Sequence, residues 1–245
     1  MIVVANKRKK IETLQKEYPG CVIIDVTSNS DDPEFVKFSP FYPHGGIPVP
    51  GMTISAACVE GIWQGLKIFE GEGISLETLR NRTMKNIKRT TRTHGRCIGH
   101  KVGGRVIGYL TARHEIYLPS YLWVLQNKLQ RHVEMISDIA RRSTVVLLDY
   151  ETNPDVNDPS KPLSHASLIK AYIEGNYPLT EGVSAPGQET AGEDADGLKA
   201  GQRVRHPKFG DGTVKELLDG GLVIVVFDEL GEKKLSLKLA RLESI

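Results

Sequence analysis

The sequence has 245 residues, of which 40% are hydrophobic and 25% are charged, and its formal net charge at pH 7 is +2. This composition is typical of a globular protein, and so small a net charge indicates no class of partner by itself. No apolar run approaches the roughly 18 residues of a membrane span, and the opening MIVVANKRKK has the wrong order for a signal peptide. We therefore expect a cytoplasmic protein with no membrane partner.

The three cysteines, Cys21, Cys58 and Cys97, form no Cys-x-x-Cys pair and have no histidine at zinc spacing. A disulfide framework and a structural zinc site are therefore both disfavoured, and a reducing compartment fits best. We expect neither a metal nor a cofactor.

Short strands alternate with longer helices along the first 180 residues. Apolar runs predict strands at residues 2–5, 21–28 and 145–150, with a further short strand or turn at 105–110. Periodicity and capping signals predict helices at residues 7–18, 55–69, 76–89, 119–139 and 164–174, the last with Ser164 as N-cap and Gly175 beyond its end. Four prolines between residues 38 and 51 exclude a regular helix there. The pattern predicts a mainly helical α+β or α/β domain whose strand order stays open.

Residues 182–197, GVSAPGQETAGEDADG, change the composition of the chain. The segment is rich in Gly, Ala and acidic residues, and Val183 is its one sizeable apolar residue. Because it cannot bury enough apolar surface to offset the entropy of ordering, we predict a flexible linker over residues 181–197. The linker would join a domain of residues 1–180 to a smaller one of residues 198–245.

The predicted helix at residues 55–69 carries three polar residues along an otherwise apolar sequence. Glu60, Gln64 and Lys67 are spaced so that they share one face. A solvated edge with a weak salt bridge is one reading of this stripe. The small residues around its start favour another, in which the helix packs closely on other backbone and the carboxylate lies in a cleft: Ser55, Ala56, Ala57, Cys58 and Gly61.

The stretch also resembles a known family. The segments FSPFYP (38–43) and VEGIWQGLK (59–67) are similar to the FSNFYP loop and the SxEHxYQAxK helix of the NADAR (YbiA-like) N-glycosidases. The resemblance extends over residues 36–175 and implies that Glu60 is catalytic, although Gly61 replaces the histidine of the family. The family's aspartate falls on Asp155, with Asp149 and Asp158 as near competitors.

Cleavage of an N-glycosidic bond develops positive charge on the sugar, which a carboxylate stabilises while a second group assists departure of the base. Glu60 suits the first role and Asp155 the second. The remaining candidate substrate-binding residues are three aromatic residues, which would stack on a base, and the two polar partners of Glu60: Phe41, Tyr42, Trp63, Gln64 and Lys67. A structural role for Glu60 and a simple turn role for Asp155 stay open.

Residues 79–105 contain nine basic residues, and no acidic residue occurs between Glu77 and Glu115. An ordinary solvated surface interleaves both signs of charge, so this run favours contacts with the phosphates of nucleic acid. A small phosphorylated nucleotide and a simple basic face are the alternatives. The candidate nucleic-acid-binding residues are Arg80, Arg82, Lys85, Lys88, Arg89, Arg92, Arg96, Lys101 and Arg105.

After residue 198, short apolar runs alternate with Gly-Asp and Asp-Gly-Gly turns, which predicts a small antiparallel barrel. GQRVRHPKFGDGTV (201–214) and VIVVFDELGEKKL (223–235) resemble the C-terminal Tudor-like (SH3-like) domain of UvrD-type repair helicases. The resemblance implies a docking module for RNA polymerase or nucleic acid that has no active site. Whether its basic edge contacts a partner or only solvent stays open: Arg203, Arg205, His206 and Lys208.

Together these features predict a hydrolase of N-glycosidic bonds that acts on nucleic acid. The expected activity is that of a DNA glycosylase that removes a modified or ADP-ribosylated base, in repair or in defence against foreign DNA. Two alternatives are an N-glycosidase of small nucleotide-type metabolites and a non-enzymatic protein that binds DNA or RNA polymerase.

Overall fold

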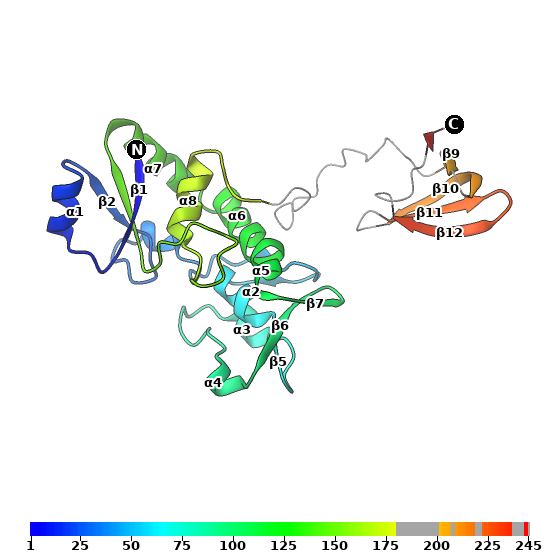
Figure 1. The fold of residues 1–245 in the computed structure, drawn as a ribbon, viewed down its shortest axis with the longest axis horizontal. Helices are drawn as coiled ribbons and strands as arrows, with labels where there is room; N and C mark the ends of the chain where they lie inside the picture. Colours follow the sequence, from blue (N-terminus) through cyan, green and yellow to red (C-terminus); the bar gives the residue numbers. More distant parts are fainter. Residues whose placement is uncertain (180–200, 207–208, 219–221, 237–242, 245) are drawn as a thin grey trace. The chain divides into compact units, whose positions relative to one another are not determined.

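The computed structural model describes residues 1–179, 201–206, 209–218, 222–236 and 243–244 (Figure 1). The chain divides into two compact units, Met1–Gln188 and Glu189–Ile245, which are described separately. The predicted linker at residues 181–197 lies outside the described residues. No helix in the described part of the chain is long and apolar enough to cross a membrane.

A small parallel sheet organises one part of the first unit. Its strand order is β1 (Ile2–Asn6), β8 (Val145–Asp149), β2 (Val22–Asp25), and β8 is parallel to both neighbours. Every residue of β8 is buried, as a continuous apolar run requires. Leu14 of helix α1 (Ile11–Glu17) packs against Val146 and Leu148 of β8. The alternate β8 residues, Val145 and Leu147, belong to the main core together with residues of α7 (Gln130–Arg142) and α8 (His165–Ile173).

An antiparallel sheet organises the other part of this unit. Its order is β5 (Lys67–Phe69), β6 (Cys97–Val102), β7 (Arg105–Ile107). Near it lie three short helices, α2 (Val59–Gly65), α3 (Leu76–Arg80) and α4 (Thr91–His94) (Figure 1). The remaining short elements of the preceding segment are a 3₁₀ turn η1 (Phe35–Phe38) and a two-strand ladder of β3 (Ile47–Pro48) and β4 (Ser55–Ala56).

Helix α5 (Tyr109–Ala112) leads through a π-helical turn η2 (Arg113–Tyr117) into α6 (Leu118–Asn127). The helix predicted at residues 119–139 is therefore two helices, because Lys128 and Leu129 leave helical geometry between α6 and α7. Helix α8 has the predicted cap: the Ser164 hydroxyl accepts a hydrogen bond from the Ser167 N–H, and Gly175 adopts left-handed geometry with φ +75°.

Three other helix predictions were too long, and the one at residues 7–18 begins only at Ile11. The helix predicted at residues 55–69 is α2 alone, since β4 precedes it and β5 follows it. The helix predicted at residues 76–89 ends at Arg80, because the Asn81 side chain accepts from the Thr83 N–H and donates to the Lys85 carbonyl, both at 2.8–2.9 Å. Such local bonds offer the backbone an alternative to the helix.

The second unit contains an antiparallel sheet. Among its described residues the order is β12 (Gly231–Ser236), β11 (Leu222–Phe227), β10 (Gly210–Leu218), β9 (Arg203–His206), β13 (Glu243–Ser244). Four valines and Phe227 form its buried core. The chain is thus a mixed α+β protein with several small sheets, which confirms the broad fold class.

Candidate functional site

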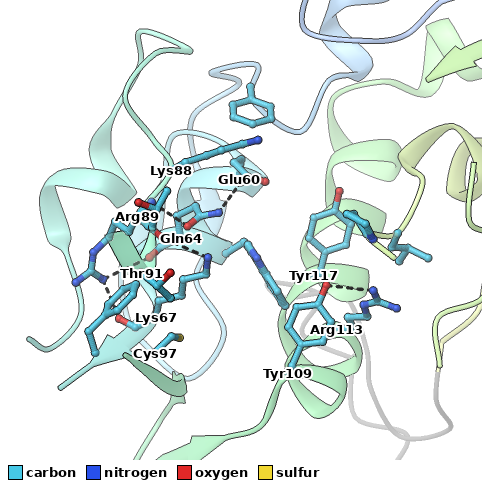
Figure 2. Close-up of a pocket in the computed structure, with 16 residues that line it drawn as sticks. Glu60, Gln64, Lys67, Lys88, Arg89, Thr91, Cys97, Tyr109, Arg113 and Tyr117 are labelled. Atoms are coloured by element: carbon cyan, nitrogen blue, oxygen red, sulfur yellow. Dashed lines mark hydrogen bonds between the residues drawn. The ribbon is translucent and has the colours of Figure 1, made fainter. Parts of the chain in front are cut away.

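A cavity of about 420 Å³ lies in the first unit (Figure 2). One wall comes from α2 and β5, another from the segment that joins α3 to α4, and a third from α5 and η2. The lining residues are Phe41, Glu60, Trp63, Gln64, Lys67, Phe69, Lys88, Arg89, Thr90, Thr91, Cys97, Tyr109, Arg113, Tyr117, Pro162 and Leu163. Of the catalytic and substrate-binding residues predicted from the sequence, five share this cavity: Phe41, Glu60, Trp63, Gln64 and Lys67.

Helix α2 is held in place at its N-terminus and along the face that packs on α3. The Cys58 thiol caps it by accepting from the Gly61 N–H, and the Glu60 N–H donates to the Pro40 carbonyl at 2.8 Å. A Cβ on Gly61 would lie 3.0 Å from the Thr78 carbonyl oxygen, and one on Gly65 would lie 2.7 Å from the Leu79 side chain. The small residues therefore allow α2 to pack closely on α3, and the loop containing FSPFYP lies against the helix start.

Glu60 is a partly buried carboxylate with one side-chain partner. Its Oε1 accepts a hydrogen bond from Gln64 Nε2 at 2.8 Å. Burial raises the pKa of Glu60, and the Gln64 hydrogen bond and the positive charges of Lys88 and Lys67 offset that rise only in part. A carboxyl group with a raised pKa is a better proton acceptor at neutral pH than an ordinary one.

Gln64 and Lys67 connect Glu60 to the segment before α4. The Gln64 Oε1 accepts from the Arg89 N–H at 3.0 Å, so the amide bridges the carboxylate and this backbone. Lys67 opens β5 rather than continuing α2, yet its side chain still lines the cavity. Burial lowers the pKa of Lys67, while the Glu60 carboxylate opposes the shift.

Aromatic rings form much of the remaining wall. The Trp63 ring packs against His100, with centroids 4.1 Å apart, and is met edge-on by Tyr109 and Tyr117. Burial lowers the pKa of His100 to about 4, so this ring is neutral at pH 7. Tyr42 is the one predicted aromatic residue that does not line the cavity; its ring lies 4.8 Å from His44.

The buried guanidinium of Arg113 explains the position of Asp155. Arg113 donates to the backbone carbonyls of Asp155, Val156, Asp158 and Lys161, at 2.5–3.4 Å, which holds the 155–163 loop and places Pro162 and Leu163 in the cavity wall. The Asp155 carboxylate is exposed and accepts from the Asn157 N–H. The structure therefore does not bring this carboxylate into the cavity with Glu60.

The two competing aspartates also lie elsewhere. Asp149 is buried and paired with His165 at 2.9 Å, and the Asp158 carboxylate accepts from the Ser160 N–H. Neither lines the cavity. In the described residues no cluster of three or more His, Cys, Asp or Glu side chains is arranged to hold a metal ion.

The nine basic residues of the 79–105 stretch fall into two groups. Arg89 is buried and donates to the carbonyls of Lys67 and Gly73 and to Glu72, so it is a structural residue and not part of a phosphate-contacting surface. Arg96 pairs with Glu70 and Arg105 with Glu115. The other six have no ion pair within the described part of the chain: Arg80, Arg82, Lys85, Lys88, Arg92 and Lys101. Of these, Lys88 reaches the cavity.

Several cavity residues gave no sequence signal of function. Tyr109 and Arg113 lie around a π-helical turn, a feature frequent at functional sites that no short motif indicates. Thr91 and Cys97 line the cavity because β6 pairs with β5.

Comparison with known proteins gives a family for this fold and site. Residues 6–169 match the family described as "Family of unknown function (DUF6939)". The chain belongs to this family. The matched range includes every lining residue of the cavity and ends before the second unit. No curated protein matches the chain. The resemblances to NADAR N-glycosidases and to the helicase Tudor-like domain thus rest on their motifs.

Proposed function

We propose that this protein hydrolyses N-glycosidic bonds in nucleic acid and removes a modified or ADP-ribosylated base from DNA, in repair or in defence against foreign DNA. The observation that carries the proposal is a cavity in which Glu60 lies among aromatic rings and lysines. A carboxylate and flat apolar walls are what the cleavage of a base from a sugar requires.

Glu60 has the central chemical role in this proposal. As the bond between base and sugar breaks, positive charge develops on the anomeric carbon, and the ionised carboxylate stabilises it or takes a proton from the attacking water. Trp63 and Phe41 would stack on the base. Gln64 holds the carboxylate by its 2.8 Å hydrogen bond, which fixes the direction in which the second oxygen is available.

The basic residues favour nucleic acid over a free metabolite. Six cations of the 79–105 stretch have no ion pair in the described part of the chain, so their charge is available to phosphates. A base inside a duplex must be extruded before it enters a cavity of this kind, while basic side chains hold the flanking backbone. Lys88 belongs to the basic stretch and also lines the cavity, so it could contact a phosphate next to the extruded base.

The test compares wild-type protein with Glu60→Gln, which keeps the shape of the side chain and removes its charge. Both are incubated with single- and double-stranded oligonucleotides that each carry one modified or ADP-ribosylated base, and abasic sites are detected by alkaline cleavage. We expect Glu60→Gln to lose at least about 1,000-fold in rate. The matched control is Glu12→Gln, an exposed residue of α1, which should retain full activity.

Two results would contradict the proposal in different ways. Equal formation of abasic sites by wild type and Glu60→Gln would remove Glu60 from the mechanism. If no abasic site forms on any of the DNAs, the proposed DNA glycosylase activity is wrong.

A second candidate function is hydrolysis of free nucleotides. It is favoured by the cavity itself, since about 420 Å³ is a usual size for a small-molecule site and Lys67 inside it could bind a phosphate. Salt separates the two candidates. Affinity for DNA that falls steeply with salt indicates a phosphate-tracking surface, whereas a weak dependence together with cleavage of free nucleotides supports the second candidate.

For the second unit we propose the Tudor-like barrel and a docking role toward RNA polymerase or nucleic acid. The short antiparallel strands and the valine-rich core support the barrel. Two of its predicted edge cations are already ion-paired, Arg203 with Asp228 and Arg205 with Asp211. Lys208 lies outside the described residues. Because Arg203 and Arg205 are neutralised by these pairs, a protein partner fits this edge better than a phosphate backbone.

A further inference from the structure

The proposed reaction needs a second group besides Glu60. As the bond to the sugar breaks, its electron pair moves onto the base nitrogen, and a hydrogen-bond donor at the base lowers the barrier. None of the three aspartates considered from the sequence lines the cavity. A donor must therefore come from another lining residue.

Tyr117 is a lining residue with a fixed orientation. It ends the π-helical turn η2, its ring stacks on Tyr121 with centroids 6.2 Å apart, and Trp63 meets it edge-on at 5.9 Å. In Figure 2 its hydroxyl is directed toward the same end of the cavity as Glu60, whereas Tyr109 is turned toward Arg113.

The hydroxyl of Tyr117 differs from those of its neighbours. Tyr121 donates to the Phe38 carbonyl at 2.7 Å, and Tyr177 donates to the Leu118 carbonyl at 2.9 Å. The Tyr109 hydroxyl accepts from Arg113 at 3.1 Å. No hydrogen bond is made by the Tyr117 hydroxyl within the described residues. It is therefore the one hydroxyl of this aromatic group that is free to bind a ligand in the cavity.

The protonation state of Tyr117 suits a donor. Burial raises its pKa well above the ordinary value, and the negative charges of Glu60 and Asp149 act in the same direction. The phenol consequently keeps its proton at neutral pH. Glu60 and Tyr117 line the same cavity.

We propose that the Tyr117 hydroxyl donates a hydrogen bond to the departing base, which makes it a second catalytic residue of the proposed hydrolysis. The inference rests on that proposed function. Water oxygen bonds to the anomeric carbon as the bond to the base nitrogen breaks, and Glu60 takes a proton from the water. That proton then passes to the base nitrogen, so one water molecule is divided between sugar and base. Tyr117 keeps its own proton throughout.

The closing experiment uses Tyr117→Phe in the full chain, on the oligonucleotide that the wild type cleaves fastest. The variant keeps the ring contacts and breaks no bond within the described protein, so its thermal melting should match the wild type. We expect kcat to fall about 100-fold while KM stays within about threefold, because the donor acts mainly on the transition state. Tyr121→Phe is the matched control: it loses a buried structural hydrogen bond but should keep its kcat.

A second substrate distinguishes a donor from a structural residue. When the same base is alkylated on a ring nitrogen, it leaves as a neutral molecule and needs less help from a donor. The rate difference between wild type and Tyr117→Phe should then shrink to less than about tenfold. A merely structural role would slow both substrates equally.

The outcomes separate this inference from the function on which it rests. Activity of Tyr117→Phe equal to wild type, or equal slowing on both substrates, overturns the role of Tyr117 and leaves the hydrolase in place. A wild type that cleaves neither oligonucleotides nor free nucleotides overturns the proposed function and this role with it.

Discussion

Two carboxylates of the first unit show the difference between a structural site and a chemical one. Asp149 ends β8 and accepts four hydrogen bonds, from the N–H groups of Tyr150 and Ala166, the Ser164 hydroxyl and His165 Nδ1, at 2.7–3.2 Å. Glu60 lies at a cavity and accepts one from a side chain, that of Gln64. Both are removed from bulk water, but Asp149 has four protein donors in its place and Glu60 has one side-chain donor.

The pKa directions follow from these partners. Burial alone would raise the pKa of Asp149, but the His165 charge and the surrounding donors bring it below its ordinary value. In Glu60 the same effect of burial is only partly offset, and its pKa stays raised. A satisfied carboxylate stabilises the fold, whereas one left with spare acceptor capacity in a cavity is available to a substrate.

The largest effect on stability is expected at Asp149. Asp149→Ala leaves His165 buried and bonded only to the Val26 carbonyl, and the Ser164 hydroxyl and the Ala166 N–H lose their acceptor. Breaking a buried ion pair from one side costs about 3–5 kcal/mol of unfolding free energy. Urea unfolding measures this difference. A loss below about 1 kcal/mol would contradict the structural role of Asp149.

A smaller effect is expected where α2 packs on α3. Gly65→Ala places a Cβ within 2.7 Å of Leu79, and overpacking of this kind costs about 1–3 kcal/mol. A shift of α2 would also move Glu60, so we expect activity to fall by more than the loss of folded protein accounts for. Gly73→Ala is the control, since a Cβ there meets nothing within 4 Å. Unchanged activity in Gly65→Ala would mean that Glu60 needs no precise position.

Removal of the Glu60 charge should stabilise the protein at neutral pH. A raised folded-state pKa contributes stability that is present below the unfolded pKa and is lost as pH rises through the folded pKa. Glu60→Gln should therefore gain about 0.5–2 kcal/mol at pH 7. The gain should disappear as pH falls toward the ordinary glutamate pKa of 4.5. Chemical denaturation at several pH values measures it, and a stability loss at pH 7 would contradict the comparison.

Asp149 and His165 should show their own pH dependence in the same measurement. The lowered pKa of Asp149 contributes stability above its unfolded value of 3.8 that is lost as pH falls through the folded pKa. The raised pKa of His165 contributes stability that is complete below 6.5 and is lost as pH rises through its folded pKa. Asp149→Ala should abolish both dependences. Their persistence in this variant would show that the pair is not their source.

The smallest effect concerns the cation at the cavity. Lys88 has no ion pair in the described part of the chain, so Lys88→Ala should weaken DNA binding similarly for all sequences and reduce the salt slope of log affinity by about 1. Fluorescence anisotropy at a series of salt concentrations gives the slope. Lys16→Ala, an exposed lysine of α1, is the control and should leave it unchanged. An unchanged slope in Lys88→Ala would exclude a phosphate contact at this residue.

Sequence patterns predicted those elements whose signals are local. The apolar runs of β1 and β8 appear at the predicted places, and Ser164 caps α8 because a hydroxyl three residues before an N–H needs no distant partner. The longer helix predictions overran their ends. Nothing in the periodicity of residues 55–69 indicates that β6 pairs with residues 67–69, since that pairing joins segments about thirty residues apart.

The cavity residues also separate into those that local sequence predicts and those that it does not. Sequence alone determined which residues of α2 line the cavity, because the spacing of Glu60, Trp63 and Gln64 follows from helical geometry. Tertiary structure decided what faces them. It brings Tyr117 from the π-helical turn and Lys88 from the loop before α4, and it keeps the Asp155 carboxylate outside, because Arg113 binds the backbone of that loop. Long-range packing, which no local spacing encodes, therefore selected the residues that face this helix across the cavity.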